Sequence, residues 1–266
     1  MMSERSRILA MLQPDPLPGS YLNQGESFPE ITEHAMAEAA QLAKIGYDGF
    51  ILQNMHDGPL RQHAQPQTLT YMTMLAAELR RAFPDKYLGI LVNWDGVASL
   101  AVAEAARADF IRVEYLYTGV SVGLCGMVEG QCAEILDLKK KLGSTMPVYA
   151  DAQEVSGHFL AAPDKIDEGV RIVQRAYADG LFMSGKDQQE SLDLIQKLRL
   201  RLPKTPVILG GRATGDNIYE LMKVYDGVSV ATWIKDGNMR NPINLEKAEF
   251  FYEEAQRGWQ TRMHYV

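Results

Sequence analysis

Eight short apolar runs alternate with eight amphipathic stretches along the 266-residue chain, and this alternation constrains the fold more than any other feature. The apolar runs are Arg7–Leu12, Gly49–Gln53, Leu88–Asn93, Phe110–Tyr115, Pro147–Ala152, Gly180–Ser184, Val207–Gly211 and Gly227–Trp233. The helical stretches are Pro29–Ile45, Thr68–Ala82, Val97–Ala106, Cys132–Leu142, Lys165–Tyr177, Gln188–Leu200, Asp216–Val224 and about Leu245–Gln256. Strands separated by helices pair in parallel, and eight such units complete a barrel of about 250 residues. We therefore predict an α/β fold, a (β/α)8 TIM barrel.

The organisation of the chain is expected to be a single domain over residues 1–266, with a C-terminal tail at 257–266. No composition shift or linker divides the sequence. The alternative is an open doubly wound sheet, which is disfavoured because no GxGxxG follows the first run. An Asp precedes four runs, at Asp48, Asp109, Asp179 and Asp226, where Asp suits a helix exit and tight turn. This recurrence indicates a weak repeat of paired βα units.

Composition excludes several classes of partner. The net charge is −7, and no basic cluster exceeds Lys139–Lys141, so we expect neither nucleic acid nor an anionic membrane as partner. No run of about 18 apolar residues is present, so membrane insertion is not expected. The two cysteines, Cys125 and Cys132, match no zinc pattern and suggest no disulfide scaffold. A cytoplasmic location follows as the expectation.

The segment Pro206–Asp236 carries the most specific signal for a ligand. One apolar run ends on Gly210-Gly211, a helix-like segment follows, and the next run ends at Thr232 with Lys235 beyond it. Glycines let the backbone approach an anion, and the last two units of many TIM barrels hold a phosphate in this way. We predict that Gly210, Gly211 and Thr232 bind the phosphate of a small-molecule ligand.

Three charged residues lie at the ends of the fourth and fifth runs, where TIM barrels place their active sites. Arg112 and Glu114 are two residues apart and share one side, while Ile111 and Val113 suit the side that faces the helices. Asp151 should also project inward. Such charges are costly unless they pair with each other or bind a ligand, so a structural ion-pair layer is the alternative to a site. We predict Glu114 and Asp151 as catalytic, either one as the general base, and Arg112 as ligand-binding.

Lys235 is the third predicted catalytic residue. A lysine there could pair with an anion, act as an acid, or form a Schiff base if burial lowers its pKa; a solvated loop lysine is the alternative. Polar residues at other strand ends complete the predicted ligand-binding set: Asn54, Asp57, Ser184 and Gly185.

The metal and cofactor of such a site are open. Asp15, Asp57, Glu114 and Asp151 could together hold Mg²⁺ with a substrate phosphate, although no spacing imposes this. FMN could use the same phosphate corner, but no sequence pattern indicates the flat apolar slot it needs, so FMN is not expected. His56 lies near enough to the rim to be a candidate acid or base, although a surface histidine is the commoner case.

A series of motifs resembles the BtpA/SgcQ family in order from Leu9 to about Glu246. They are PLPGS at Pro16–Ser20, GYDGFILQN and DGP within Gly46–Pro59, ADFIRV at Ala108–Val113, TG and GMVEG within Thr118–Gly130, YAD at Tyr149–Asp151, PVILGG at Pro206–Gly211, DGVSVATWIKDG at Asp226–Gly237, and Asn241-Pro242. The resemblance implies a TIM barrel of the ribulose-phosphate-binding type. It also implies one of two roles: photosystem I biogenesis, or a sugar- or nucleotide-related enzyme.

The chain departs from the family pattern at the ends of its strands. Members usually carry His at the position of Gln13, Arg-Asn-Asp where this chain has Trp94-Asp95-Gly96, and a His and a Lys where it has Gln153 and Val155. The Gly and Pro scaffold is kept. We interpret the chain as a divergent member with a changed ligand or a lost activity.

Two functions remain open from the sequence. The first is an enzyme of carbohydrate or nucleoside metabolism, a lyase, isomerase or hydrolase, that acts on a phosphorylated metabolite. The second is a non-catalytic assembly or regulatory factor, suggested by the missing His and Lys and by the tail with Trp259 and Tyr265. The tail is expected to cover the base of the barrel or to form an oligomer contact, and a homo-oligomer is expected.

Overall fold

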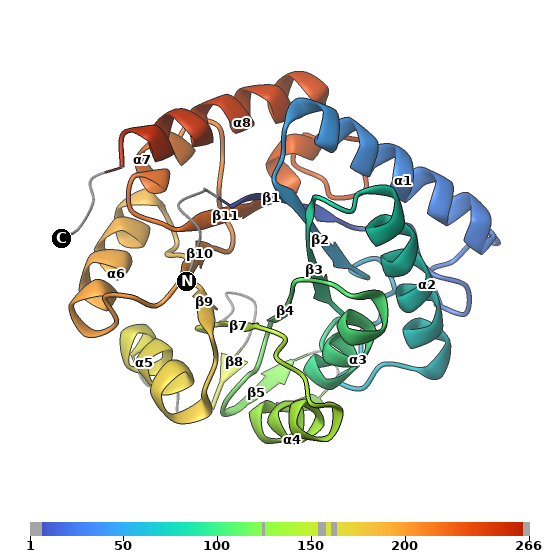
Figure 1. Ribbon diagram of the computed structural model, residues 1–266, viewed down its shortest axis with the longest axis horizontal. Coiled ribbons are helices and arrows are strands. Elements are labelled where there is room, and N and C mark those ends of the chain that lie inside the picture. Colours follow the sequence, from blue (N-terminus) through green and yellow to red (C-terminus); the bar gives the residue numbers. More distant parts are fainter. Residues whose placement is uncertain (1–6, 124–125, 154–157, 161–163, 263–266) are drawn as a thin grey trace.

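The structure is a computed structural model that describes residues 7–123, 126–153, 158–160 and 164–262. Eight parallel strands close into a barrel in the order β1-β11-β10-β9-β7-β4-β3-β2, and helices surround it (Figure 1). These strands are β1 Ile8–Leu12, β2 Gly49–Gln53, β3 Tyr87–Leu91, β4 Phe110–Val113, β7 Val148–Asp151, β9 Gly180–Phe182, β10 Val207–Leu209 and β11 Gly227–Val230. The helices are α1 Phe28–Ile45, α2 Pro66–Ala82, α3 Gly96–Ala106, α4 Cys132–Leu142, α5 Lys165–Ala176, α6 Gln188–Arg201, α7 Ile218–Met222 and α8 Leu245–Gln260. The predicted TIM barrel is confirmed.

The core has two parts because side chains alternate along each strand. One apolar cluster fills the barrel itself, from Leu9 and Met11 on β1 to Phe110, Tyr149 and Phe182 on the opposite strands. The larger cluster lies between strands and helices and includes Ile111 and Val113, as predicted from their alternation with Arg112. At Gly89 the ring of Phe110 lies 2.3 Å from where a Cβ would be, so only glycine fits there.

The aspartates before four strands make the same pair of hydrogen bonds to a neighbouring strand. In each case the Asp carboxylate accepts a bond of 2.7–2.8 Å from the backbone N–H of the residue at or next to the start of the neighbouring strand. The Asp backbone N–H in turn donates to the carbonyl of that same residue, at 2.8–3.0 Å. The pairs are Asp48 with Ile8, Asp109 with Leu88, Asp179 with Val148, and Asp226 with Val207. The barrel is thus built from four paired βα units, and the predicted repeat has a physical cause beyond turn formation.

The structure differs from the sequence prediction mainly in the long connections. The segment after β4, expected to be a loop, contains strands β5 Val120–Gly123 and β6 Gly126–Glu129, which form a small antiparallel sheet with β8 His158–Phe159. The helix expected at Asp216–Val224 is only the five-residue α7, and Thr232–Lys235 forms a 3-10 helix, η1. Cys125 lies outside the described residues.

The described part of the C-terminal tail packs against the chain's own barrel. Helix α8 extends to Gln260, and Trp259 packs on the main core. Arg262 donates 2.6 Å to Asp226 and 3.2 Å to the carbonyl of Tyr225, at the end of the barrel where β11 begins. This is the predicted covering of the base; Tyr265 lies outside the described residues. Within the part of the chain that the structure describes, no helix has the length and apolar character needed to cross a membrane.

Candidate functional site

A cavity of about 590 Å³ occupies the mouth of the barrel, at the C-terminal ends of its strands. A volume of this size is typical of small-molecule sites. The cavity is lined by residues that follow most of the eight strands, including Gln13, Gln53, Trp94, Glu114, Ser184, Gly211 and Thr232. The sequence placed the site at this end, and the cavity lies there.

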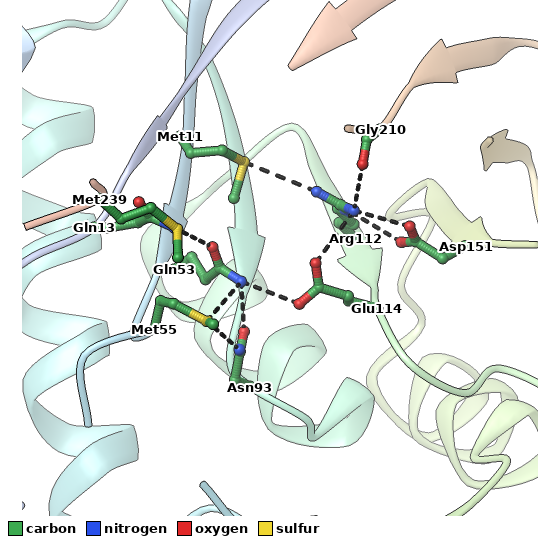
Figure 2. Close-up of polar contacts among 10 residues, drawn as sticks. All are labelled: Met11, Gln13, Gln53, Met55, Asn93, Arg112, Glu114, Asp151, Gly210 and Met239. Carbon is green, nitrogen blue, oxygen red and sulfur yellow. Dashed lines mark hydrogen bonds and ion pairs between the residues drawn. The ribbon is translucent and has the colours of Figure 1, made fainter. Parts of the chain in front are cut away.

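The guanidinium of Arg112 is held in the mouth of the barrel by hydrogen bonds, ion pairs and a contact with an aromatic ring. Its Nε and one terminal nitrogen donate to the two carboxylate oxygens of Asp151, at 2.9 and 2.8 Å, and Glu114 lies 3.2 Å away (Figure 2). The guanidinium also stacks 4.3 Å above the ring of Phe182 and donates 3.4 Å to the carbonyl of Gly210. Burial raises the pKa of Asp151, and the charge and hydrogen bonds of Arg112 oppose that rise. The three predicted charges are therefore brought together and mutually paired.

Glu114 belongs to a second chain of polar contacts across the mouth. Gln53 donates to Glu114 at 3.1 Å and to Asn93 at 2.9 Å, and its own oxygen accepts from Gln13 at 2.8 Å (Figure 2). The side chain of Glu114 is 15% exposed, whereas that of Asp151 is 7% exposed and committed to Arg112. Of the two predicted bases, Glu114 is the one that lines the cavity.

Three methionines complete the same region, and polar donors point at their sulfurs. Gln13 lies 3.4 Å from the sulfur of Met239, Asn93 lies 3.3 Å from that of Met55, and Arg112 lies 3.9 Å from that of Met11. A thioether is a weak acceptor, so these contacts add little to the other hydrogen bonds of Gln13 and Arg112. The Oε1 atom of Gln13 is buried and has no hydrogen-bond partner among the described residues.

The predicted glycine corner faces this cavity. Gly210, Gly211 and Thr232 all line it, with Arg212, Ala213 and Thr214 beside them. Gly211 has a φ of +156°, and a Cβ there would lie 3.5 Å from Ser184 Oγ. In the described part of the chain, the backbone N–H groups of Gly211 and Arg212 donate no hydrogen bond. They are thus available to an anion.

Ser184 and Gly185, at the end of β9, have different positions. Ser184 lines the cavity, and its carbonyl accepts 2.9 Å from Lys165 at the start of α5. Gly185 instead donates to the hydroxyl of Ser191 at 2.9 Å, and a Cβ there would clash with Glu190 at 2.7 Å. Gly185 therefore serves close packing of the β9–α6 turn.

Asn54 and Asp57 line a neighbouring cavity of about 540 Å³, away from the glycine corner. Asn54 donates 3.0 Å to Asp57, and the other Asp57 oxygen accepts 2.7 Å from the N–H of Leu17. Burial raises the pKa of Asp57, and these two hydrogen bonds oppose the rise. The pair ties the loop after β2 to the loop after β1.

Lys235 lies apart from the other predicted catalytic residues. It is 2% exposed, and its ammonium contacts both carboxylate oxygens of Glu38 on α1, at 2.9 and 3.0 Å. It lines a separate cavity of about 350 Å³ together with Glu38 and His56. An ammonium held by a carboxylate is a poor nucleophile, so this contact disfavours Schiff-base chemistry.

His56 is buried rather than exposed on the surface. One ring nitrogen, Nδ1, lies 3.1 Å from the carbonyl of Pro14, while Nε2 has no partner among the described residues. Burial lowers the pKa of His56, and nearby Lys235 and Arg240 add to the effect. The folded protein therefore favours the neutral form of His56.

The carboxylates considered for Mg²⁺ do not converge. Asp15 pairs with His34 at 2.9 Å, Asp57 is bound in its loop, and Asp151 is held by Arg112. Within the described ranges, no group of three or more His, Cys, Asp or Glu side chains is arranged to hold a metal ion.

An aromatic wall in the cavity was not predicted as part of the site. Trp94 and Tyr115 stack with ring centroids 4.7 Å apart, and both line the cavity. Trp94 follows β3 and Tyr115 follows β4, so the available signal was their position at strand ends. From the sequence, Trp94 was identified as a departure from the family pattern and not as part of an aromatic wall.

The fold and the site together define a class: a (β/α)8 barrel with a polar, arginine-centred mouth and a glycine corner after its seventh barrel strand. The sequence matches the BtpA family over residues 4–257, so this chain belongs to the BtpA family. It is 35% identical over 259 residues to an uncharacterized protein of Thermococcus kodakarensis, covering 95% of this chain and 96% of that protein. It is 30% identical to the photosystem I biogenesis protein BtpA of Synechocystis sp., covering 93% and 87% of the two chains.

Solved structures with the same fold are more distant in sequence. N-(5'-phosphoribosyl)anthranilate isomerase from Pyrococcus furiosus has a TM-score of 0.57 at 14% identity, covering 95% of this chain and 99% of that one. The 3-hexulose-6-phosphate synthase from Salmonella typhimurium has a TM-score of 0.57 at 16% identity, with coverage of 95% and 99%. The predicted family and barrel are confirmed.

Proposed function

We propose that this BtpA-family barrel binds a phosphorylated small molecule in its mouth, with the phosphate at Gly210, Gly211 and Thr232. The observation that carries the proposal is that these residues line one cavity together with Arg112 and Glu114. The N–H groups of Gly211 and Arg212 supply donors for an anion. Two barrels of similar fold are named for phosphorylated compounds, which agrees with the proposal.

The proposal further makes the protein an enzyme that uses Glu114 as a general base. Glu114 lines the cavity, and Gln53 and Arg112 hold its two oxygens. A carboxylate oriented in this way can take a proton from a ligand bound beside it. Asp151 has the role of orienting Arg112, and Lys235 has no role in catalysis.

The experiment is thermal unfolding with inorganic phosphate, ribose 5-phosphate and other sugar phosphates, each with and without Mg²⁺. A ligand at a hundred times its dissociation constant stabilises the folded state by about 2.7 kcal/mol, which shifts the midpoint measurably. A specific shift for phosphate esters supports the proposal. If no compound shifts the midpoint, the phosphate site is rejected.

The second candidate is a non-catalytic assembly role. It is favoured by the 30% identity to a protein named for photosystem I biogenesis. In that case phosphate esters would leave the unfolding midpoint unchanged, and Glu114→Gln would change at most the stability of the isolated barrel.

A further inference from the structure

The mouth cavity has two chemically different sides that face each other across the barrel. In a closed ring of eight strands, members four places apart are diametrically opposed. The observed order therefore places β3 opposite β10, and β4 opposite β11. Trp94, which follows β3, thus lies across the ring of strands from Gly210 and Gly211 after β10, and Tyr115 after β4 lies across it from Thr232 after β11; all five line the cavity.

The side at β3 and β4 carries two stacked aromatic rings, which form an aromatic wall next to Arg112 and Glu114. Trp94 and Tyr115 stack at 4.7 Å with their ring planes only 25° apart, and Met55 lies in the same cavity lining. Thioether sulfurs pack favourably against aromatic rings, and stacked aromatic side chains offer a face to another ring. Trp94 and Met55 also line the adjacent cavity of about 860 Å³ beneath the loop after β2, so the wall has space on two sides.

The backbone holds this wall in an unusual conformation. Tyr115 has a φ of +78°, and the N–H of Leu116 donates 3.1 Å to the carbonyl of Glu114. This is a three-residue γ-turn of the strained type, rare for a bulky residue. Such strain concentrates at functional sites, and the buried ring of Tyr115 lies in the lining of the cavity.

The middle of the cavity requires both donors and acceptors from a ligand. Gln13 Oε1 is buried without a partner in the described part of the chain, so it lacks a donor. Gln13 also directs an N–H group at the sulfur of Met239, which is a weak acceptor (Figure 2). A hydroxyl group can satisfy both needs, since it donates one hydrogen bond and accepts others.

Taken with the proposed phosphate site, on which this inference rests, the geometry points to a ligand of one class. We infer that the mouth binds a phosphate monoester joined through a hydroxylated linker to a planar aromatic ring. The phosphate lies at the glycine corner, the hydroxyl groups lie near Gln13, and the ring packs against Trp94. Nucleoside 5′-monophosphates and FMN share this chemistry, whereas ribose 5-phosphate lacks the ring.

The test measures dissociation constants by calorimetry for AMP, CMP, FMN, adenosine and ribose 5-phosphate. Wild type is expected to bind at least one ring-bearing phosphate at least about fivefold more tightly than ribose 5-phosphate, because stacking on an aromatic side chain contributes at that level. Which of AMP, CMP or FMN binds most tightly distinguishes a nucleobase from a flavin ring. Trp94→Leu should remove this advantage and leave ribose 5-phosphate binding within about twofold.

Two matched variants make the test specific. Trp94→Phe keeps a ring and should retain most of the advantage, while quenching by the ring-bearing ligand should be weaker than in wild type, because Trp233 also lines the mouth and remains. Trp259→Leu, on α8 away from the mouth, should change neither the affinity for the ring-bearing phosphates nor that for ribose 5-phosphate. Circular dichroism confirms that each variant is folded, and the difference in quenching between wild type and Trp94→Phe gives an answer that does not need Trp94→Leu.

The outcomes separate this inference from the proposed function. If ribose 5-phosphate binds as tightly as every ring-bearing phosphate and Trp94→Leu changes nothing, the ring site is wrong while the phosphate site stands. If adenosine binds as tightly as AMP, the phosphate corner contributes nothing and both proposals fail. If no phosphate ester binds, the proposed function fails and this inference fails with it.

Discussion

Arg112 is bound by both carboxylate oxygens of Asp151, at 2.9 and 2.8 Å, and both side chains are at least nine-tenths buried. A buried charge is tolerated when its partner is in place and becomes costly when the partner is removed. Asp151→Ala should therefore lower the free energy of unfolding by about 3–5 kcal/mol.

The double variant Arg112→Met/Asp151→Leu provides the control, because it removes both charges together. It should destabilise the protein less than Asp151→Ala alone, as measured by urea unfolding. A single variant that costs less than about 1 kcal/mol would mean that the pair is solvated.

The paired βα units make a second prediction, for the base of the barrel. Asp226 accepts from the N–H of Val207 at 2.8 Å and from Arg262 at 2.6 Å. Asp226→Ala removes the carboxylate from a strand N–H and from two arginines, Arg262 and Arg199, and should cost about 2–4 kcal/mol of unfolding free energy.

Asp85 is the matched control for Asp226. It also lies just before a strand, β3, but it is exposed and makes no hydrogen bond within the described residues. Asp85→Ala should change the unfolding free energy by no more than about 0.5 kcal/mol. If both alanine variants lost the same unfolding free energy, the hydrogen bonds of Asp226 to the neighbouring strand would not be the cause of the loss.

The lowered pKa of His56 leads to a prediction of how the stability of the protein depends on pH. Burial lowers the pKa of His56 in the folded protein, while in the unfolded chain the pKa is about 6.5. As pH falls below about 6.5, the unfolded chain takes up a proton that the folded protein does not, so stability declines. His56→Asn should lose less stability than wild type between pH 7 and pH 5 in urea titrations at both pH values. A steeper loss in the variant would mean that the folded histidine is protonated.

We expect a substitution of Lys235 to lower the stability of the protein without changing its affinity for phosphate esters. Its ammonium contacts both oxygens of Glu38, and the two residues line a cavity separate from the mouth. Lys235→Met should lower the unfolding free energy by about 1–3 kcal/mol, because Glu38 loses its partner but keeps some exposure to water. The affinity for phosphate esters, measured by calorimetry, should be unchanged. A loss of more than tenfold would mean that Lys235 takes part in ligand binding.

The sequence predicted the elements well where local pattern and fold agree. Strand β2 at Gly49–Gln53 and helix α4 at Cys132–Leu142 have the predicted limits, because Gly and polar residues bound their apolar patterns. Helix α7 was predicted too long, since its ends are determined by packing against α8 and not by caps. The small sheet of β5, β6 and β8 joins segments from two connections, and no local pattern reports that pairing.

The site was predictable in part for the same physical reason. The alternation at Ile111 to Glu114 fixed which side chains enter the barrel, so the Arg112 cluster could be anticipated. The pairing of Lys235 with Glu38 and the stacking of Trp94 on Tyr115 join residues on different elements. Those contacts depend on how the loops above the barrel fold, which strand periodicity does not determine.

The most direct test of the phosphate site compares Gly211→Val with Gly25→Val in calorimetric titrations of phosphate esters. Both glycines have positive φ, +156° and +112°, so valine strains the backbone at both, but only Gly211 lines the mouth cavity. Gly211→Val should weaken binding by about tenfold or more, the loss of one good charge-assisted hydrogen bond, while Gly25→Val binds as wild type does. Equal affinity of both variants and wild type for every phosphate ester would contradict a phosphate site at this corner.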